Sequence, residues 1–178
     1  MVIKTNWYIV SGAPGSGKTT TLERLASLGY AVSPEAARVM IDKAIKRGET
    51  IRQIRGDEAE FQKRVFRMKI EIENKIAPGK LTFIDGGGLP APIAYYRVAG
   101  LAPSVVVKEV KKRKYRGVFF LERLPYKKDY ARVEDEGTAK VLHELLYRAY
   151  QELGCRVIRV PVGSIEERTK FILSRLDG

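Results

Sequence analysis

The sequence predicts an α/β domain of the doubly wound class, in which a mainly parallel, five-stranded sheet lies between two layers of helices. Apolar segments of strand length alternate with helical patterns along the chain. A glycine-rich phosphate-binding motif follows the first strand pattern and opens the first helical one. The length of 178 residues fits a single domain, expected to span residues 1–178.

Five short apolar segments are the predicted strands, because strands buried on both faces of a parallel sheet read as nearly continuous apolar runs. They are residues 7–11, 30–33, 81–85, 117–121 and 156–160. The first helix is expected over 17–27, and Gly29 ends it. The second begins near Pro34, which suits a first helical turn, and keeps an apolar face through Ile45.

Polar residues separate the second helix from a long third one. The break runs from Arg47 to Gly56, and Asp57 with Glu60 resembles a capping box before an apolar face that ends near Pro78. Further helices are expected through Tyr95-Tyr96-Arg97, over 108–114, over 141–153 and after Ser164, which forms a second capping box with Glu167.

The phosphate-binding motif is the most informative feature of the chain. It reads Gly12-Ala13-Pro14-Gly15-Ser16-Gly17-Lys18-Thr19, and Thr20 follows. Small residues let backbone N–H groups surround a phosphate, and the helix that begins there turns its positive end toward it. Lys18 suits the β- and γ-phosphates, and the Thr19 hydroxyl suits Mg²⁺. The motif predicts a nucleoside triphosphate site; the alternative is a glycine-rich turn without a ligand.

Ligands of open α/β sheets bind at the carboxyl ends of the strands, so the residues just after each strand are candidates. Asp85 is expected to hold Mg²⁺, unless it only caps a helix. Glu35 is the candidate that accepts a proton from an acceptor hydroxyl, and Arg38, on the same helix face, is the candidate that holds the acceptor. The alternative is a first-turn carboxylate with a surface ion pair.

A polar stretch over residues 122–137 follows the fourth strand and resembles a lid. Its cations include Arg123 and Arg132, which can neutralise charge on the γ-phosphoryl group when the lid closes. The alternative is a solvated loop. No Asn-Lys-x-Asp guanine signature occurs, which favours ATP over GTP and keeps GTP as the alternative.

Charge composition predicts anionic partners. Lys and Arg number 33 against 21 Asp and Glu, a net charge of +12. The densest basic run, Lys108–Arg116, can meet nucleic acid or acidic lipid, or can be a solvated helix face. Cys155 is the single cysteine, which predicts no internal disulfide and a cytoplasmic location. The usage of Lys, Arg and Glu with little Gln and Asn resembles that of a thermophile.

Several segments together resemble a family of small AAA-type P-loop proteins related to the nicotinamide-riboside kinase domain of NadR, which includes many archaeal predicted ATPases. The matching segments are SGAPGSGKTT at 11–20, PEAAR at 34–38, FID at 83–85, LPAPIAYYR at 89–97, YRGVFFLE at 115–122 and LGCRVIRVPVGSIEERTKFIL at 153–173. The resemblance covers nearly the whole chain.

The resemblance implies a kinase-like P-loop NTPase that binds Mg-nucleotide at residues 12–20, with Glu35 and Arg38 near the acceptor. Some relatives phosphorylate nicotinamide riboside, and an animal relative binds GTP and phosphoinositide. Relatives usually have Asp-Arg-Gly where this chain has Asp85-Gly86-Gly87. The missing arginine argues against riboside-kinase activity and leaves nucleotide binding unaffected.

The function expected from the sequence is therefore Mg²⁺-dependent binding of a nucleoside triphosphate, with hydrolysis or transfer of its γ-phosphate. One alternative is a small-molecule kinase for a nucleoside-like acceptor. The other is a nucleotide-gated switch that binds acidic lipid or nucleic acid through Lys108–Arg116.

Overall fold

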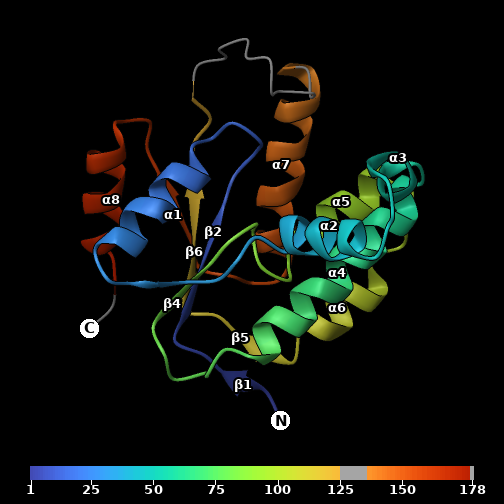
Figure 1. The fold of residues 1–178 in the computed structure, drawn as a ribbon. Coiled ribbons are helices and arrows are strands. Elements are labelled where there is room, and N and C mark those ends of the chain that lie inside the picture. The colour runs from blue at the N-terminus through green and yellow to red at the C-terminus, as the bar shows by residue number, and fades with distance from the viewer. Residues whose placement is uncertain (125–135, 177–178) are drawn as a thin grey trace.

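A computed structural model of the chain describes residues 1–124 and 136–176. Helices and strands alternate through these ranges (Figure 1). None of the helices there combines the length and the apolar character needed to cross a membrane.

The main sheet has five parallel strands, as the sequence predicts. They are β2 (Trp7–Ser11), β3 (Ala31–Val32), β4 (Thr82–Ile84), β6 (Gly117–Leu121) and β7 (Val157–Val160), in the spatial order β3-β4-β2-β6-β7. The chain leaves the central β2 for one edge of the sheet and later crosses to the other side. This reversal beside β2 makes a crevice at the carboxyl ends of the strands, where ligands of such sheets bind.

Helices cover both faces of the sheet (Figure 1). On one face, α1 (Lys18–Ser27) and α8 (Ile165–Leu173) pack on Val10, Phe83 and Phe119. On the other, α5 (Pro92–Val98) and α7 (Glu136–Glu152) pack on Ile9 and Phe120. Outside this second layer lie α2 (Ala36–Lys46), α3 (Ile51–Arg55), α4 (Glu58–Asn74) and α6 (Ser104–Val110).

Two local predictions were wrong. The expected polar break at 47–56 contains the short helix α3, which Thr50 and Gln53 begin with a complete capping box and which buries Ile54. The expected helix over 108–114 ends at Val110, and residues 113–114 form strand β5, which pairs in parallel with β1 (Ile3–Lys4) as a second, two-stranded sheet. Long-range pairing with the N-terminal segment overrides the local helical pattern there.

Of the two predicted capping boxes, the one at α8 is complete, and at α4 only the Asp57 half is present. The Asp57 carboxylate accepts a hydrogen bond from the Glu60 N–H at 3.0 Å and begins α4. Ser164 and Glu167 form a full capping box at α8, with each side chain accepting from the backbone N–H of the other.

A tight glycine turn follows β4 and fixes the end of that strand. Gly86, Gly87 and Gly88 all have left-handed backbones, with φ of 62°, 75° and 59°. The Gly87 N–H donates to the Val10 carbonyl at 3.1 Å, and its own carbonyl accepts from the Tyr150 hydroxyl at 2.9 Å. A Cβ on Gly87 would lie 2.6 Å from that hydroxyl, so the turn is packed rather than flexible.

We predict that Gly87→Ala destabilises the protein by about 3 kcal/mol, because backbone strain and overpacking both act there. Gly100→Ala is the matched control: Gly100 has φ of 70°, but a Cβ there meets nothing within 4 Å. Strain alone should cost that variant about 1–2 kcal/mol. Urea unfolding of both variants measures the difference, and equal losses would show that the turn has room for a side chain.

Candidate functional site

The P-loop lies between β2 and α1, at the carboxyl edge of the sheet (Figure 1). Gly12, Gly15 and Gly17 have positive φ of 145°, 77° and 84°, which accounts for three of the glycines in the motif. A Cβ on Gly12 would lie 2.8 Å from the Leu121 carbonyl oxygen, so the loop passes directly against the end of β6. The sequence thus folds here into a loop that only small residues allow.

Lys18 is the cation held at this loop. Its Nζ donates to the carbonyl oxygens of Gly12 at 2.8 Å and Ala13 at 2.9 Å. Gly17 precedes α1 in a left-handed conformation and supplies no side-chain cap to the helix. The start of α1 therefore has no side-chain cap from Gly17 and lies beside an ammonium group of fixed position, an arrangement that suits an anion. Thr19 and Thr20 are both exposed at this helix start.

Arg168 of α8 holds the P-loop through its buried side chain, and the sequence analysis did not predict this role. Its side chain is buried, and its guanidinium donates to the Ser16 carbonyl, to the Glu122 carbonyl at 2.8 Å and to the Pro161 carbonyl at 3.2 Å. Burial lowers the pKa of this guanidinium, and the nearby Glu122 opposes that shift. The available signal was its spacing, because Arg168 lies on the same face of α8 as Ile172.

Asp85 is the first residue beyond β4. Its N–H donates to the Ser33 hydroxyl at 2.9 Å, and its carboxylate accepts from the Gly86 N–H. Burial raises the pKa of Asp85 above its ordinary value, and the charge of Glu35 adds to the rise. The Gly86 N–H and the ammonium groups of Lys69 and Lys18 lower that pKa. The P-loop lysine and two carboxylates therefore share one electrostatic neighbourhood.

Glu35 occupies the N-cap of α2. Its two carboxylate oxygens accept from the N–H groups of Ala37 and Arg38, each at 2.9 Å. The capping role considered from the sequence is present, and each oxygen retains a second lone pair for an acceptor hydroxyl. The Arg38 side chain is exposed and pairs with Asp42 at 3.6 Å, one turn along α2, so its expected place at the acceptor remains a prediction.

Lys69 is the second residue that sequence reasoning missed. It comes from α4, is buried, and donates to the Gly86 carbonyl at 2.7 Å. A Cβ on Gly86 would lie 3.1 Å from Lys69 Nζ and 3.5 Å from Glu35 Oε1. Burial lowers the pKa of Lys69, and Glu35, Glu73 and Asp85 counteract that shift. The chain thus brings a cation from α4 to the turn at which the resemblance implies an arginine.

A lysine on an apolar helix face was the signal for Lys69. It lies four residues after Val65 and three before Ile72, both of which belong to the face that predicted α4. Such a position is seldom filled by a charge without an electrostatic or functional partner.

The expected lid is described only at its two ends. Arg123 lies two residues beyond β6, and its guanidinium is 3.9 Å from the Glu136 carboxylate at the start of α7. Arg132 lies outside the described residues, as does most of 122–137. The roles of both arginines at the γ-phosphate remain predictions.

Magnesium is the metal expected here, and the donor atoms suit it. Thr19 offers a hydroxyl and Asp85 a carboxylate, both of them hard oxygen donors. Across 1–124 and 136–176, no three or more His, Cys, Asp and Glu side chains gather as a metal site. Mg²⁺ usually takes one or two protein ligands and completes its coordination with water and substrate phosphate, and Thr19 and Asp85 are the residues expected to supply the protein ligands.

Solved structures of small kinases share this fold. NadR protein in complex with NR has a TM-score of 0.70 at 17% identity, over 96% of this chain and 49% of that one. Thymidylate kinase from Ehrlichia chaffeensis has a TM-score of 0.67 at 16% identity, over 96% of this chain and 97% of that one. Shikimate kinase from Aquifex aeolicus has a TM-score of 0.57 at 22% identity, over 96% of this chain and 95% of that one. The chain spans about half the length of the NadR protein. Fold and loop together define a P-loop domain of the kinase-like class.

The chain belongs to a family of AAA domains, whose model matches residues 7–168. The resemblance expected from the sequence is confirmed by this match and by the likeness to NadR. No curated protein sequence matches the chain.

We predict that Arg168→Met lowers the free energy of unfolding by about 2–3 kcal/mol, because three carbonyl oxygens lose their donor. Arg175→Met is the control, since Arg175 is exposed and its guanidinium only lies over the Phe171 ring at 5.1 Å. It should cost less than about 1 kcal/mol. Urea denaturation measures the free energy of unfolding of both variants. Similar losses of stability in the two variants would mean that the three carbonyl groups do not depend on Arg168.

Proposed function

We propose that this domain binds Mg-ATP in the P-loop and transfers the γ-phosphoryl group to a hydroxyl of a small-molecule acceptor. The observation that carries the proposal is the gathering of Lys18, Glu35, Lys69 and Asp85 at the carboxyl edge of the sheet. Phosphoryl transfer needs positioned positive charge and an oriented nucleophile more than covalent chemistry, and this set supplies both.

The nucleotide would be held by the backbone of residues 12–20, which includes Gly12, Ala13, Pro14, Gly15, Ser16, Gly17, Lys18, Thr19 and Thr20. Lys18 lies where it can leave the loop carbonyls for the β- and γ-phosphates. Thr19 and Asp85 would hold Mg²⁺, which when bound neutralises charge on the phosphates. Arg123 and Arg132 would add positive charge from the lid.

The acceptor would lie beside Glu35, beyond the end of β3. Glu35 accepts two backbone hydrogen bonds, which fix its carboxylate without using all of its lone pairs. It is the group proposed to orient the acceptor hydroxyl and accept its proton. Lys69 is a positioning residue, because it holds the Gly86 carbonyl and lies among the carboxylates.

Transfer is favoured over hydrolysis by the kinase-like fold and by this partly buried set of charges, of which Lys69 is buried. NR and shikimate in the names of similar structures suggest a hydroxyl-bearing small molecule as acceptor class. ATP is the proposed donor, with GTP as the alternative, and the cytoplasm, where both are abundant, is the proposed location. Hydrolysis alone and a nucleotide-gated switch remain the competing outcomes of the assays below.

Lys18→Ala should weaken Mg-ATP binding roughly 10- to 100-fold, because a charge-assisted contact to the phosphates is lost. Lys46→Ala, at the exposed end of α2, removes the same charge away from the loop and should leave affinity unchanged. Isothermal titration calorimetry with a non-hydrolysable ATP analogue measures both. Unchanged affinity in Lys18→Ala would reject the P-loop assignment.

Turnover assays separate the three outcomes. ADP release is followed with Mg-ATP alone and with candidate acceptors that carry a hydroxyl, beginning with nicotinamide riboside, thymidylate and shikimate. An acceptor that multiplies ADP release supports the kinase. Steady release that no acceptor changes supports a hydrolase, and very slow release with tight retention of nucleotide supports a switch.

Lys69→Met should lower turnover about 10- to 100-fold, as is typical when a group that orients metal or substrate ligands is lost. The variant should also lose about 1–3 kcal/mol of stability, because the Gly86 carbonyl loses its donor and the nearby carboxylates lose a compensating cation. Turnover is therefore measured where circular dichroism shows that the variant is folded. Lys43→Met is the control, because Lys43 forms an exposed ion pair with Glu71 at 3.4 Å. A Lys69→Met protein with full turnover would remove Lys69 from the proposed mechanism.

A further inference from the structure

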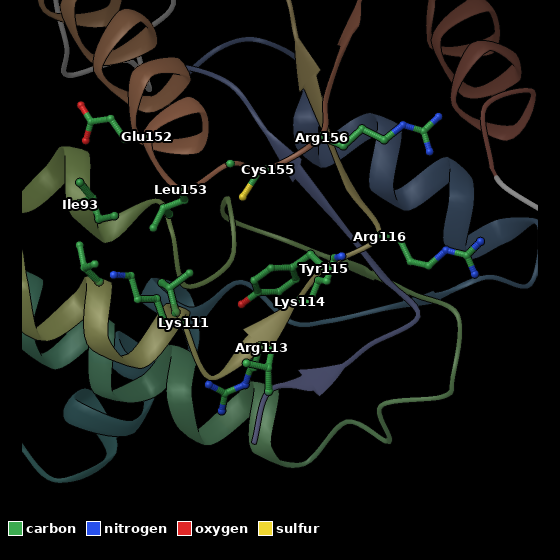
Figure 2. A pocket seen from close by; sticks show the side chains of 14 residues that line it. Ile93, Lys111, Arg113, Lys114, Tyr115, Arg116, Glu152, Leu153, Cys155 and Arg156 are labelled. Atoms are coloured by element: carbon green, nitrogen blue, oxygen red, sulfur yellow. The ribbon is translucent and has the colours of Figure 1, made fainter.

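A cavity lies at the opposite edge of the sheet from the P-loop. It has a volume of about 800 Å³ and is lined mainly by residues 113–116, just before β6, and 152–156, just before β7 (Figure 2). Because the strands are parallel, these amino ends face away from the carboxyl edge that carries Lys18. The five residues of β6, at about 3.3 Å each, separate the two sites by about 16 Å.

The floor of this cavity is apolar. Ile93 of α5, Val107 and Val110 of α6, and Leu153 after α7 contribute aliphatic side chains, and Cys155 contributes its thiol. In Figure 2 the Cys155 sulfur points into the space between Leu153 and Tyr115. The Tyr115 hydroxyl faces away from solvent and donates to Glu73 at 2.7 Å, so its ring is the part that lines the cavity. Such a floor suits an apolar ligand body.

The rim is cationic. Five basic side chains line the cavity against one carboxylate, Glu152; the five are Lys111, Arg113, Lys114, Arg116 and Arg156. Glu152 is held by Arg97 at 2.6 Å and offsets little of this charge. Arg113 is buried and bonded to Glu109 and Asn74 as part of the wall. Lys111 and Lys114 are exposed at the opening, where an anionic group would meet them.

We propose that this cavity binds a small amphipathic anion, with its apolar body on the Ile93–Leu153 floor and its acidic group among the rim cations. The volume lies within the range of small-molecule sites in proteins. A groove for nucleic acid fits less well. The basic run is divided between α6 and β5, Arg113 is buried, and Lys112 bonds to Glu109 at 2.6 Å outside the lining. Lys111 and Lys114 are therefore the exposed cations at the opening of a concave site, and the basic run does not form one continuous stripe.

The probe for this site is 1-anilinonaphthalene-8-sulfonate, an aromatic body with one sulfonate, whose fluorescence rises in apolar surroundings. We expect one molecule to bind per chain. The variant Lys111→Glu/Lys114→Glu should weaken binding about tenfold or more, since two favourable charges become unfavourable. Lys46→Glu/Lys140→Glu makes the same change of net charge on exposed residues outside the lining and should have no effect. Circular dichroism and urea unfolding verify that each variant is folded.

Two further measurements locate the probe. Excess Mg-ATP and the Lys18→Ala variant should leave probe binding unchanged, which keeps this test independent of the proposed nucleotide site. Cys155 is the single cysteine of the chain and lines the cavity, so saturating probe should slow its alkylation by iodoacetamide. Burial raises the pKa of the Cys155 thiol, so alkylation is followed above pH 9.

The proposal is supported when the rim variant alone loses binding and the probe protects Cys155. It is overturned when the folded protein does not bind the probe, when both double variants weaken binding equally, when Mg-ATP displaces the probe, or when Cys155 reacts at the same rate with and without it.

Discussion

The geometry of the candidate site depends on buried hydrogen bonds between side chains of the helices and the carboxyl edge of the sheet. From one face, Arg168 of α8 joins the P-loop to the segments that follow β6 and β7, through the carbonyls of Ser16, Glu122 and Pro161. From the other face, the Tyr150 hydroxyl of α7 bonds to Ser11 at 2.7 Å and to Gly87 at 2.9 Å. Since the Arg168 and Tyr150 side chains are buried, these bonds are costly to break, and the loop and the glycine turn keep their positions.

The charges of Asp85 and Glu35 are balanced by a lysine that comes from a different part of the chain. Asp85 and Glu35 approach each other in a partly buried place, which by itself would favour protonation of one of them. Lys69 enters from α4 and compensates, while Gly86 leaves room for its ammonium group. The sequence has no arginine directly after Asp85, but the fold places the Lys69 ammonium group at that turn. A side chain 17 residues earlier supplies the charge.

Much of the fold could be predicted from the sequence because its signals are local. Buried parallel strands appear in the sequence as apolar runs, the glycines of the P-loop motif predict the backbone conformation of the loop, and Ser164 with Glu167 marks a helix start. The wrong predictions concern one segment whose pairing partner is distant in the sequence and one helix too short to give a strong pattern. Residues 113–114 pair with residues 3–4, and α3 has five residues with one buried side chain, although Thr50 and Gln53 carried a usable capping signal. Lys69 and Arg168 were missed because charges on apolar faces gain their meaning only from the partners that the tertiary fold provides.

The order of the strands also constrains how the chain acquires its structure during synthesis. The central strand β2 precedes both of its ladder partners in the chain, which are Thr82–Ile84 on one side and Gly117–Phe120 on the other. On a ribosome one edge of β2 must wait for about 70 further residues and the other edge for more than a hundred. Contacts so remote along the chain slow folding and expose apolar edges to aggregation. The segment that builds the phosphate loop is therefore translated before the strands that hold it in place.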